Sequence, residues 1–477
     1  MSRAQPTETG MTVPAVRELS MSAEELLQAL LNLDPSLRVS ILDSCGARTP
    51  DARFLIAGFD PFEIVEAYAD EIHISRPRAG VGEVVRGDVL NILDGRLESL
   101  RVPTPSDIPV AGACIASFSY DMARRFERLR SIAPPVEIPE PYAVLAFYDT
   151  LVVHDYLRNT TKLVSVAEDE RLYEFQKSLY EAAPTFQTSH TQESSTPHTA
   201  TSNFTRDEYI RAVLRIKEHI AAGDIYQANL TQQISVSLGT TLSPESVFLR
   251  LRSQHPASFA AFIRRRDDTI ISASPERFLR VEVKDAERTV EAWPIKGTRP
   301  RGRERKEDAR LRAELARSRK DRAENIMIVD LLRNDLGRVC RYGTVTVPEL
   351  FTIQEHPTLF HLVSQVRGLL REDVTAGDML RAAFPCGSIT GAPKLRAMEI
   401  LYETEPASRG LSMGALGYFS FDGRVDLSVA IRTMTVRDSL ARFNVGGGIV
   451  ADSQPEEEYE ESLIKARALL RALDAEL

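Results

Sequence analysis

The stretch Trp293-Pro294-Ile295-Lys296-Gly297-Thr298-Arg299-Pro300-Arg301-Gly302 places one amine between an apolar approach and a tight turn. Its two prolines fix their φ angles, and its two glycines let the backbone come close to neighbouring groups. A lysine held in such a loop can lose its hydration, which lowers the pKa of the ammonium from about 10.4 toward neutrality and frees a nucleophilic lone pair. The alternative is a solvated loop lysine, which this stretch alone favours.

The size and composition of the chain limit what it can be. With 477 residues it exceeds one ordinary core, so we expect two domains or one large composite domain. Hydrophobic residues make up 43% and charged residues 27%, which is typical of a soluble globular protein. The formal net charge of -9 argues against nucleic-acid binding, so positive charge for an anionic substrate must be local.

The cysteines and the N-terminus indicate the cellular location. The four cysteines, at positions 45, 114, 340 and 386, show neither a disulfide framework nor C-x-x-C spacing, which fits reduced thiols in the cytoplasm. The first residues are polar and lack the apolar segment of a signal peptide, and no apolar run is long enough to cross a bilayer. We therefore expect a cytoplasmic protein with no membrane partner.

Changes in composition divide the chain into four predicted parts. Residues 1–20 are predicted to be a flexible tail, and 21–183 a β-rich region. Residues 184–203 are rich in Ser, Thr, His and Gln with almost no large apolar side chains, which predicts a linker or disordered loop. Residues 204–477 form the unit that carries the candidate chemistry.

Capping signals and strand patterns predict the fold class. Ser22 with Glu25, and Thr205 with Glu208, have the spacing of capping boxes, and each is expected to open a helix. Short β-rich runs, 89–93 among them, alternate with turns in the first half. Strands and helices occur in clusters and not in strict βαβ alternation, which favours an α+β fold with large antiparallel sheets.

Two sets of acids occur at helical spacing. Asp321 and Glu324 are three residues apart, and therefore share a face of one predicted helix. Glu458, Glu461 and Lys465 follow the spacing i, i+3, i+7 on another. Such carboxylates could hold Mg²⁺, which binds one or two protein carboxylates together with waters and substrate oxygens. The alternative is a solvated helix face with an ordinary i, i+4 ion pair, and spacing alone favours it.

Anion-binding features occur near the C-terminus. The triplet Gly446-Gly447-Gly448 follows a predicted strand, and its amides could form a nest for a carboxylate; a turn or bulge explains it equally well. Residues 386–394 (CGSITGAPK) predict a turn that feeds a helix N-terminus, a position that attracts anions, but they lack the ending of a P-loop. Arg432 is either a fork for a substrate carboxylate or half of a buried ion pair.

Two more titratable residues lie near apolar strands. Glu276 could be an acid with a raised pKa, or it could pair with Arg277. His361, within an apolar run, is by default a hydrogen-bonded core histidine.

Together these stretches resemble the chorismate-binding enzymes, the family of anthranilate synthase component I, aminodeoxychorismate synthase component I and the isochorismate synthases. The resemblance runs from about residue 204 to 473, and less distinctly through the N-terminal region. The matching motifs, in order, are 223–230 (GDIYQANL), 274–278 (SPERF), 294–301 (PIKGTRPR), 321–325 (DRAEN), 333–337 (RNDLG), 387–394 (GSITGAPK), 430–433 (AIRT) and 446–453 (GGGIVADS).

The resemblance implies a sandwich-like core of large antiparallel sheets with helices outside, and chorismate, a dianion, as substrate. It implies that Glu324 and Glu461 bind Mg²⁺ with support from Asp321 and Glu458. Glu276 is implied as the general acid/base and His361 as the active-site histidine. The residues implied to hold the substrate are Gly297, Thr298, Thr390, Tyr418, Arg432, Gly446, Gly447, Gly448 and Lys465.

Two positions indicate the branch of the family. Anthranilate synthases usually have alanine at the position of Lys296, and a lysine there resembles the branch that makes aminodeoxychorismate through a covalent lysine intermediate. Isochorismate-forming members carry a water-activating lysine where this chain has Gln227, whose neutral amide has no basic lone pair for that task. Trp293 departs from the family pattern, which often has arginine there. Anthranilate synthase, an enzyme serving both pathways, and a non-catalytic chorismate-binding subunit remain alternatives.

The ammonia for such a reaction has to come from elsewhere. A glutamine amidotransferase needs a cysteine nucleophile in a glycine-flanked elbow with a histidine partner, and none of the four cysteines has that setting. We therefore expect a separate glutamine amidotransferase subunit as partner.

Overall fold

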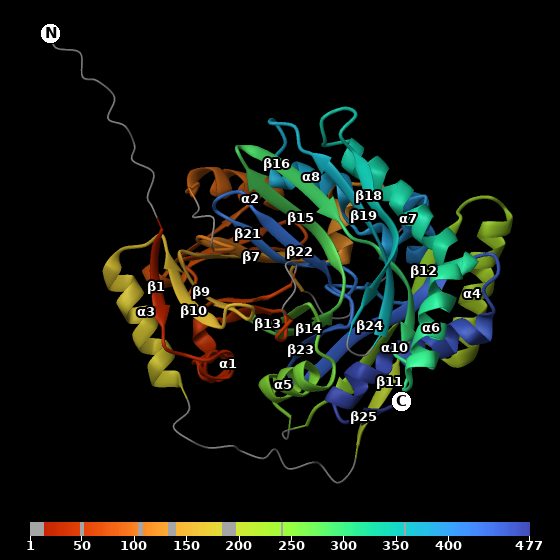
Figure 1. The fold of residues 1–477 in the computed structure, drawn as a ribbon, viewed down its shortest axis with the longest axis horizontal. Helices are drawn as coiled ribbons and strands as arrows, with labels where there is room; N and C mark the ends of the chain where they lie inside the picture. The colour runs from red at the N-terminus through yellow and green to blue at the C-terminus, as the bar shows by residue number, and fades with distance from the viewer. Residues whose placement is uncertain are drawn as a thin grey trace.

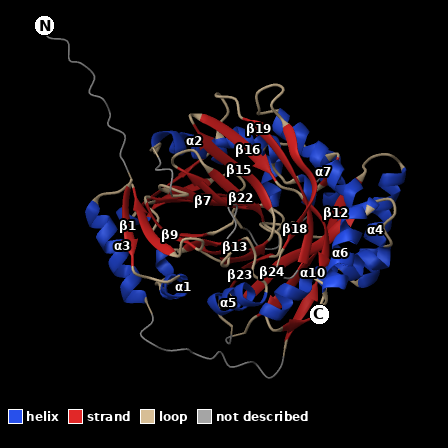
Figure 2. Cartoon of the chain, viewed as in Figure 1, coloured by secondary structure: helices blue, strands red, loops and turns tan. Residues whose placement is uncertain are grey.

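A computed structural model describes residues 14–47, 52–103, 108–131, 140–183, 197–239, 242–356 and 359–477. Its described strands form two large sheets, with helices on the outside (Figures 1 and 2). Every strand pairing is antiparallel except that of β11 with β25. The α+β fold with large antiparallel sheets is therefore confirmed.

The first sheet contains thirteen strands in the described residues. In spatial order they are β1 (Ala15–Leu19), β10 (Thr160–Ser165), β9 (Thr150–Asp155), β3 (Phe54–Gly58), β2 (Ser40–Asp43), β13 (Phe259–Arg264), β14 (Thr269–Ser274), β23 (Thr433–Arg437), β24 (Leu440–Ile449), β12 (Gln227–Ser237), β11 (His198–Ser202) and β25 (Ala475–Glu476), with β20 (Gly391–Ala392) also paired to β12.

The second sheet contains twelve strands in the same ranges. In spatial order they are β17 (Ile295–Pro300), β19 (Leu359–Leu369), β16 (Glu287–Ala292), β15 (Arg277–Lys284), β22 (Val425–Val429), β21 (Ala415–Ser420), β7 (Ala113–Phe118), β8 (Ala143–Tyr148), β4 (Glu63–Ala67), β5 (Ile72–Arg76) and β6 (Val81–Val85), with β18 (Thr346–Glu355) also paired to β19.

The helices lie mainly at the two ends of the molecule (Figure 1). Their bounds are α1 (Ala23–Asn32), α2 (Val89–Ser99), α3 (Asp169–Ala182), α4 (Arg206–Ala221), α5 (Pro244–Gln254), α6 (Arg305–Arg317), α7 (Arg319–Gly337), α8 (Ala376–Ala383), α9 (Lys394–Thr404) and α10 (Pro455–Ala472). None of these described helices combines the length and the apolar composition needed to cross a bilayer.

The helix starts follow the sequence signals with one exception. Both capping boxes are confirmed, at the starts of α1 and α4. The predicted strand 89–93 is wrong, because these residues begin α2. The carboxylate of Asp88 accepts a hydrogen bond from the Leu90 amide at 2.9 Å, so it caps the helix and outweighs the β propensity of the valine.

The predicted boundaries differ from the strands at two places. The predicted tail 1–20 is too long, because Ala15–Leu19 forms β1, paired with β10; residues 1–13 lie outside the described residues. The predicted linker 184–203 ends in β11, paired with β12, while 184–196 lie outside the described residues. Both sheets contain strands from before and after this boundary, so it does not separate two cores.

One apolar core joins the two halves of the chain. Phe118 on β7 is fully buried and packs edge-on against Phe384, which follows α8, and Phe419 on β21, with ring centroids 6.5 and 6.1 Å apart. Edge-to-face packing of buried rings adds to the free energy gained by burial. The C-terminal half therefore depends on the N-terminal half for its stability.

We predict that Phe118→Ala lowers the free energy of unfolding by about 3–5 kcal/mol, because the cavity it leaves removes contacts with both halves. Urea denaturation followed by fluorescence and circular dichroism measures this. The control is Tyr173→Ala on α3, whose side chain is 63% exposed and whose loss should change stability little. A loss below about 1 kcal/mol for Phe118→Ala would contradict the shared core.

Candidate active site

The lysine loop forms an edge strand of the second sheet. Its register with β19 shifts between Ile295 and Thr298, so Lys296 and Gly297 lie in a bulge. The half-buried Lys296 donates a hydrogen bond from Nζ to the backbone oxygen of Ser388 at 3.1 Å. Gly297 has φ +89°, and a Cβ there would lie 2.8 Å from Asp321 Cγ, so only glycine fits. The loop thus aims the amine at a fixed acceptor.

A buried acid lies beside this amine. Glu276, between β14 and β15, is 5% exposed. Burial raises its pKa to about 7, although a hydrogen bond from Ser388 and the charge of Lys296 oppose the shift. Arg277, the alternative partner, pairs instead with Asp426 at 2.8 Å. A carboxyl of this kind is partly protonated at neutral pH, as a general acid must be.

Two helices bring further carboxylates together near the lysine. Burial raises the pKa of Glu324 on α7, with the charge of Lys296 opposing the shift. Burial also raises the pKa of Glu458 on α10, and neighbouring Glu461 adds to that shift. The charges thus repel one another in a small volume. Within the described ranges, no group of three or more Asp, Glu, His or Cys is arranged to hold a metal ion.

Two lysines lie among these carboxylates. Lys320 Nζ is 3.9 Å from Glu458 Oε1. Lys465 Nζ is 2.8 Å from Glu461 Oε1 and donates to the Gly446 carbonyl at 2.8 Å. Burial acts to raise the pKa of Glu461, but its ion pair with Lys465 outweighs burial and the pKa is lowered. Lys465 therefore links α10 to the glycines of β24.

Each of the three glycines of β24 lies where an added side chain would meet a different neighbour. A Cβ at Gly447 would come within 3.1 Å of Glu458 Oε2, so its absence leaves room beside the carboxylates. A Cβ at Gly446 would overlap the Leu230 carbonyl on β12, and one at Gly448 would overlap the side-chain amide of Gln227. The strand therefore brings its backbone against both β12 and α10.

A cation and a neutral histidine lie near the lysine loop. Burial lowers the pKa of the Arg432 guanidinium, and its side chain forms no hydrogen bond or ion pair with the residues that the structure describes. Burial lowers the pKa of His361 to about 3, helped by the charges of His356 and Arg432, so its ring is neutral. His361 Nδ1 and Thr298 Oγ1 are 3.0 Å apart. Arg432 is therefore not half of an ion pair among the described residues, and its role as a fork for a substrate carboxylate stays a prediction.

Three further residues lie on segments next to the lysine loop and the glycines of β24. Thr390 is fully buried, and its hydroxyl donates to the Cys386 carbonyl at 2.9 Å. Gln227 is fully buried as well, and neither side-chain polar atom has a partner among the described residues. Ser388, in the short helix η4 (Gly387–Ile389), contacts both Lys296 and Glu276. Its role was not identified from the sequence, because it acts through a backbone carbonyl that no residue pattern reports.

Two predicted site residues are placed differently. Tyr418 on β21 lines a cavity of about 80 Å³ with Leu42, Asp43 and Phe54, and no other predicted site residue lines that cavity. No hydrogen bond joins Tyr418 to another predicted site residue in the described part of the chain, and its predicted role in holding the substrate stays a prediction. Asp321 packs on the lysine loop, and its carboxylate pairs with Arg299 at 3.3 Å. Its negative charge still raises the pKa of Glu324, so it affects this carboxyl group electrostatically while its own carboxylate pairs with Arg299.

The arrangement brings together an amine, a buried acid and a buried cation. Lys296 and Glu276 supply an amine and a proton on the same side. Arg432 supplies a positive charge whose side chain has no hydrogen-bond or ion-pair partner among the described residues. Such a site suits a small anionic molecule on which a nucleophile adds while a poor leaving group is protonated.

Known proteins resemble this chain over most of its length. Aminodeoxychorismate synthase component 1 of Salmonella typhimurium is 39% identical over 440 residues, covering 91% of this chain and 92% of the relative. Anthranilate synthase component 1 of Acetivibrio thermocellus is 34% identical, covering 97% and 95%. The solved structure of anthranilate synthase component I from Streptococcus pneumoniae superposes with a TM-score of 0.77 at 29% identity, covering 89% of this chain and 93% of that chain.

A family-level match agrees with these relatives and with the motifs quoted above. The family described as chorismate binding enzyme matches residues 41–471. This range includes the lysine loop, the acids of α7 and α10, and β24 with its three glycines, which we call the glycine strand. The chain belongs to the chorismate-binding enzyme family.

Proposed function

We propose that this protein is the chorismate-aminating subunit of an aminodeoxychorismate synthase. It would convert chorismate and ammonia to 4-amino-4-deoxychorismate, the precursor of p-aminobenzoate for folate synthesis, in the cytoplasm. The observation that carries the proposal is the position of Lys296, whose amine lies against Glu276 and the Ser388 carbonyl. The identity of 39% to an aminodeoxychorismate synthase component, against 34% to an anthranilate synthase component, supports this branch.

The proposed reaction uses Lys296 as a covalent nucleophile. The neutral amine of Lys296 forms a bond from Nζ to C2 of chorismate, and both ring double bonds shift by one position. The C4–O bond breaks as Glu276 protonates the leaving hydroxyl to water, and the newly bonded nitrogen gives up one proton. Ammonia then forms a bond to C4 and both double bonds shift back. The C2–N bond breaks as the leaving lysine nitrogen takes the proton that the new C4 nitrogen releases. Arg432 and the amides of the glycine strand hold the carboxylates of the substrate throughout.

The carboxylates of α7 and α10 are the groups that would bind Mg²⁺, although three of them are not already grouped around one point in the described residues. Glu324, Glu458 and Glu461 repel one another, and the missing side chain of Gly447 leaves room beside them. These residues would hold the ion, with Asp321 in support. When bound, Mg²⁺ supplies positive charge that offsets the ring carboxylate of the substrate.

The proposal includes a partner subunit. The relatives are named as component 1, which fits a second component that supplies ammonia from glutamine. Free ammonium salt should replace that subunit in the laboratory. Anthranilate synthase activity is the second candidate, because relatives of that name match as much of the chain. Product analysis separates the two, since anthranilate fluoresces and aminodeoxychorismate becomes p-aminobenzoate only after a lyase is added.

We predict that Lys296→Ala abolishes aminodeoxychorismate formation from chorismate, ammonium and Mg²⁺, because the nucleophile is gone. Coupled conversion to p-aminobenzoate measures it by chromatography. Lys284→Ala, at an exposed hairpin turn, is the control and should keep wild-type turnover. Normal turnover by folded Lys296→Ala protein would refute the covalent route.

We predict that Glu276→Gln loses activity but gains stability at high pH. The folded state raises this pKa from 4.5 to about 7, so folding binds a proton there that the unfolded chain has released at neutral pH. The wild type therefore loses stability as the pH rises from about 4.5 to about 7, by up to about 3 kcal/mol. Glu276→Gln removes this loss.

Urea denaturation at pH 4.5 and pH 8 tests this sign. The variant should match the wild type at the lower pH and exceed it at the higher pH. Glu98→Gln, at an exposed glutamate of α2, should show no such difference. Equal stability of Glu276→Gln and wild type at pH 8 would show that the carboxyl is not destabilised by burial.

We predict that chelation by EDTA removes activity and that Mg²⁺ restores it. Glu324→Gln should raise the Mg²⁺ concentration for half-maximal activity at least about tenfold, because one charge of the carboxylate set is lost. Glu457→Gln, exposed on α10, is the matched control and should leave that concentration unchanged. Full activity of the chelated enzyme would contradict the metal assignment.

A further inference from the structure

A buried ion pair lies behind the active-site wall. Arg409 donates from Nε and Nη2 to Glu405 at 2.8 and 2.7 Å, and the two side chains are only 1% and 3% exposed. Removing two charges from water is costly unless their remaining hydrogen-bonding groups are satisfied. The partners of this pair therefore show what it is fixed to.

The guanidinium of Arg409 binds two backbone segments that line the site. Nη1 donates to the Ile389 carbonyl at 3.0 Å, and Nη2 donates to the Asn229 carbonyl at 2.6 Å. Ile389 directly follows Ser388, whose carbonyl accepts the hydrogen bond from Lys296. Asn229 pairs with Gly448 across β12 and β24. One planar guanidinium thus fixes both backbone segments. A lysine ammonium cannot bind the two carbonyls with the same geometry.

Glu405 binds the same strand from the other side of the pair. Its Oε1 accepts from the amide and the hydroxyl of Thr231, at 2.8 and 3.0 Å. Thr231 pairs with Gly446, and its hydroxyl accepts from Asn444 Nδ2 at 3.1 Å. The pair is therefore continuous with the glycine strand.

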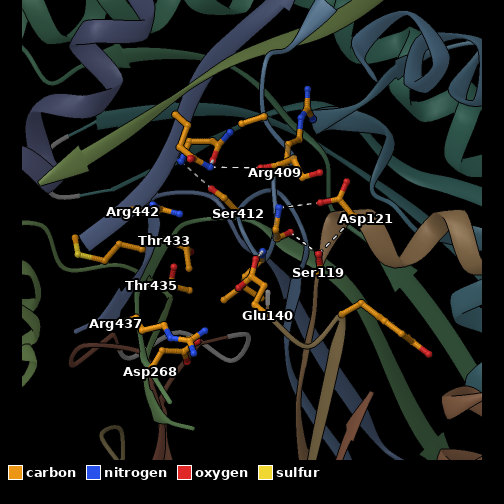
Figure 3. A pocket seen from close by; sticks show the side chains of 18 of the residues that line it. Ser119, Asp121, Glu140, Asp268, Arg409, Ser412, Thr433, Thr435, Arg437 and Arg442 are labelled. Carbon is orange, nitrogen blue, oxygen red and sulfur yellow. Dashed lines mark hydrogen bonds between the residues drawn. The ribbon is translucent and has the colours of Figure 1, made fainter. Parts of the chain in front are cut away.

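The backbone next to Arg409 is anchored to the N-terminal half of the chain. The Gly410 amide donates to Asp121 at 2.8 Å, and Ser119 Oγ donates to the Gly410 carbonyl at 2.7 Å. The Leu411 amide donates to Glu140 at 3.1 Å. These residues line a cavity of about 370 Å³, with Arg409 at its edge (Figure 3). Lys296, Glu276 and Arg432 do not line it, so the anchor lies outside the catalytic site.

We propose that Arg409 and Glu405 are positioning residues for the lysine nucleophile. Through Ile389 they hold η4 so that the Ser388 carbonyl stays where Lys296 Nζ meets it, and through Asn229 and Thr231 they hold the glycine strand opposite. This inference rests on the proposed role of Lys296. The ion pair thus connects the backbone that is anchored to the N-terminal half with the segment that fixes the amine of Lys296. Neither residue of the pair contacts the substrate in this proposal.

Steady-state kinetics with chorismate, ammonium and Mg²⁺ test this proposal. Arg409→Met should lower kcat about 100-fold while KM for chorismate rises less, since misplacing a catalytic group by about 1 Å costs about that much. Arg409→Lys keeps a charge beside Glu405 but cannot reach both carbonyls, so its thermal stability should exceed that of Arg409→Met while its kcat stays low.

Arg252→Met is the matched control. It breaks another ion pair of low exposure, Arg252–Asp43 at 2.7 Å, which joins α5 to β2. It should lower thermal stability and leave kcat unchanged. If Arg409→Met does not fold, Glu405→Gln carries the test, because it keeps the side-chain shape and loses only the charge; its kcat should also fall more than KM rises.

Two results would overturn the positioning role. One is wild-type kcat in folded Arg409→Met or Glu405→Gln protein. The other is a kcat that recovers in Arg409→Lys in parallel with stability, which would mark the pair as structural only. If the wild type itself makes no aminodeoxychorismate, the proposed function fails instead, and the two failures are thus distinguished.

Discussion

The hydrogen bond between Lys296 Nζ and the Ser388 carbonyl is the contact on which the site depends. The two residues are far apart in the sequence and lie on different elements, a bulged edge strand and a short helical turn. A lysine side chain has four rotatable bonds, so a fixed acceptor is needed to hold its amine in one position. Gly297 makes the bulge possible, since its φ and the closeness of Asp321 exclude every other residue.

Charge around this contact is balanced within a short distance. The chain carries a net charge of -9, yet Lys296, Lys320 and Lys465 lie among the carboxylates of α7 and α10. Each positive charge lowers the free energy needed to ionise a nearby carboxyl group, and burial raises that free energy. Glu276 lies where burial dominates and raises its pKa to about 7, so it is partly protonated at neutral pH. One site can therefore contain both a proton donor and ionised carboxylates.

Sequence patterns predict helix starts and candidate polar residues, but they do not predict which residues those polar groups contact in the folded protein. Capping boxes fixed the starts of α1 and α4, since these signals are local. The β-rich composition of 89–93 predicts a strand, but the cap by Asp88 makes this segment the start of α2. The role of Tyr418 rests on family resemblance alone and stays a prediction, and its side chain lines a separate small cavity. The contacts of Ser388 and Arg409 pass through backbone carbonyls, which depend on tertiary structure and leave no residue pattern.

Mass spectrometry of the protein incubated with chorismate and Mg²⁺, without ammonia, tests the central claim most directly. A covalent lysine route predicts an adduct on the peptide that contains Lys296, equal to chorismate less one water, which disappears when ammonium is added. An unmodified Lys296 peptide during active turnover, or an adduct at a different residue, would contradict the account.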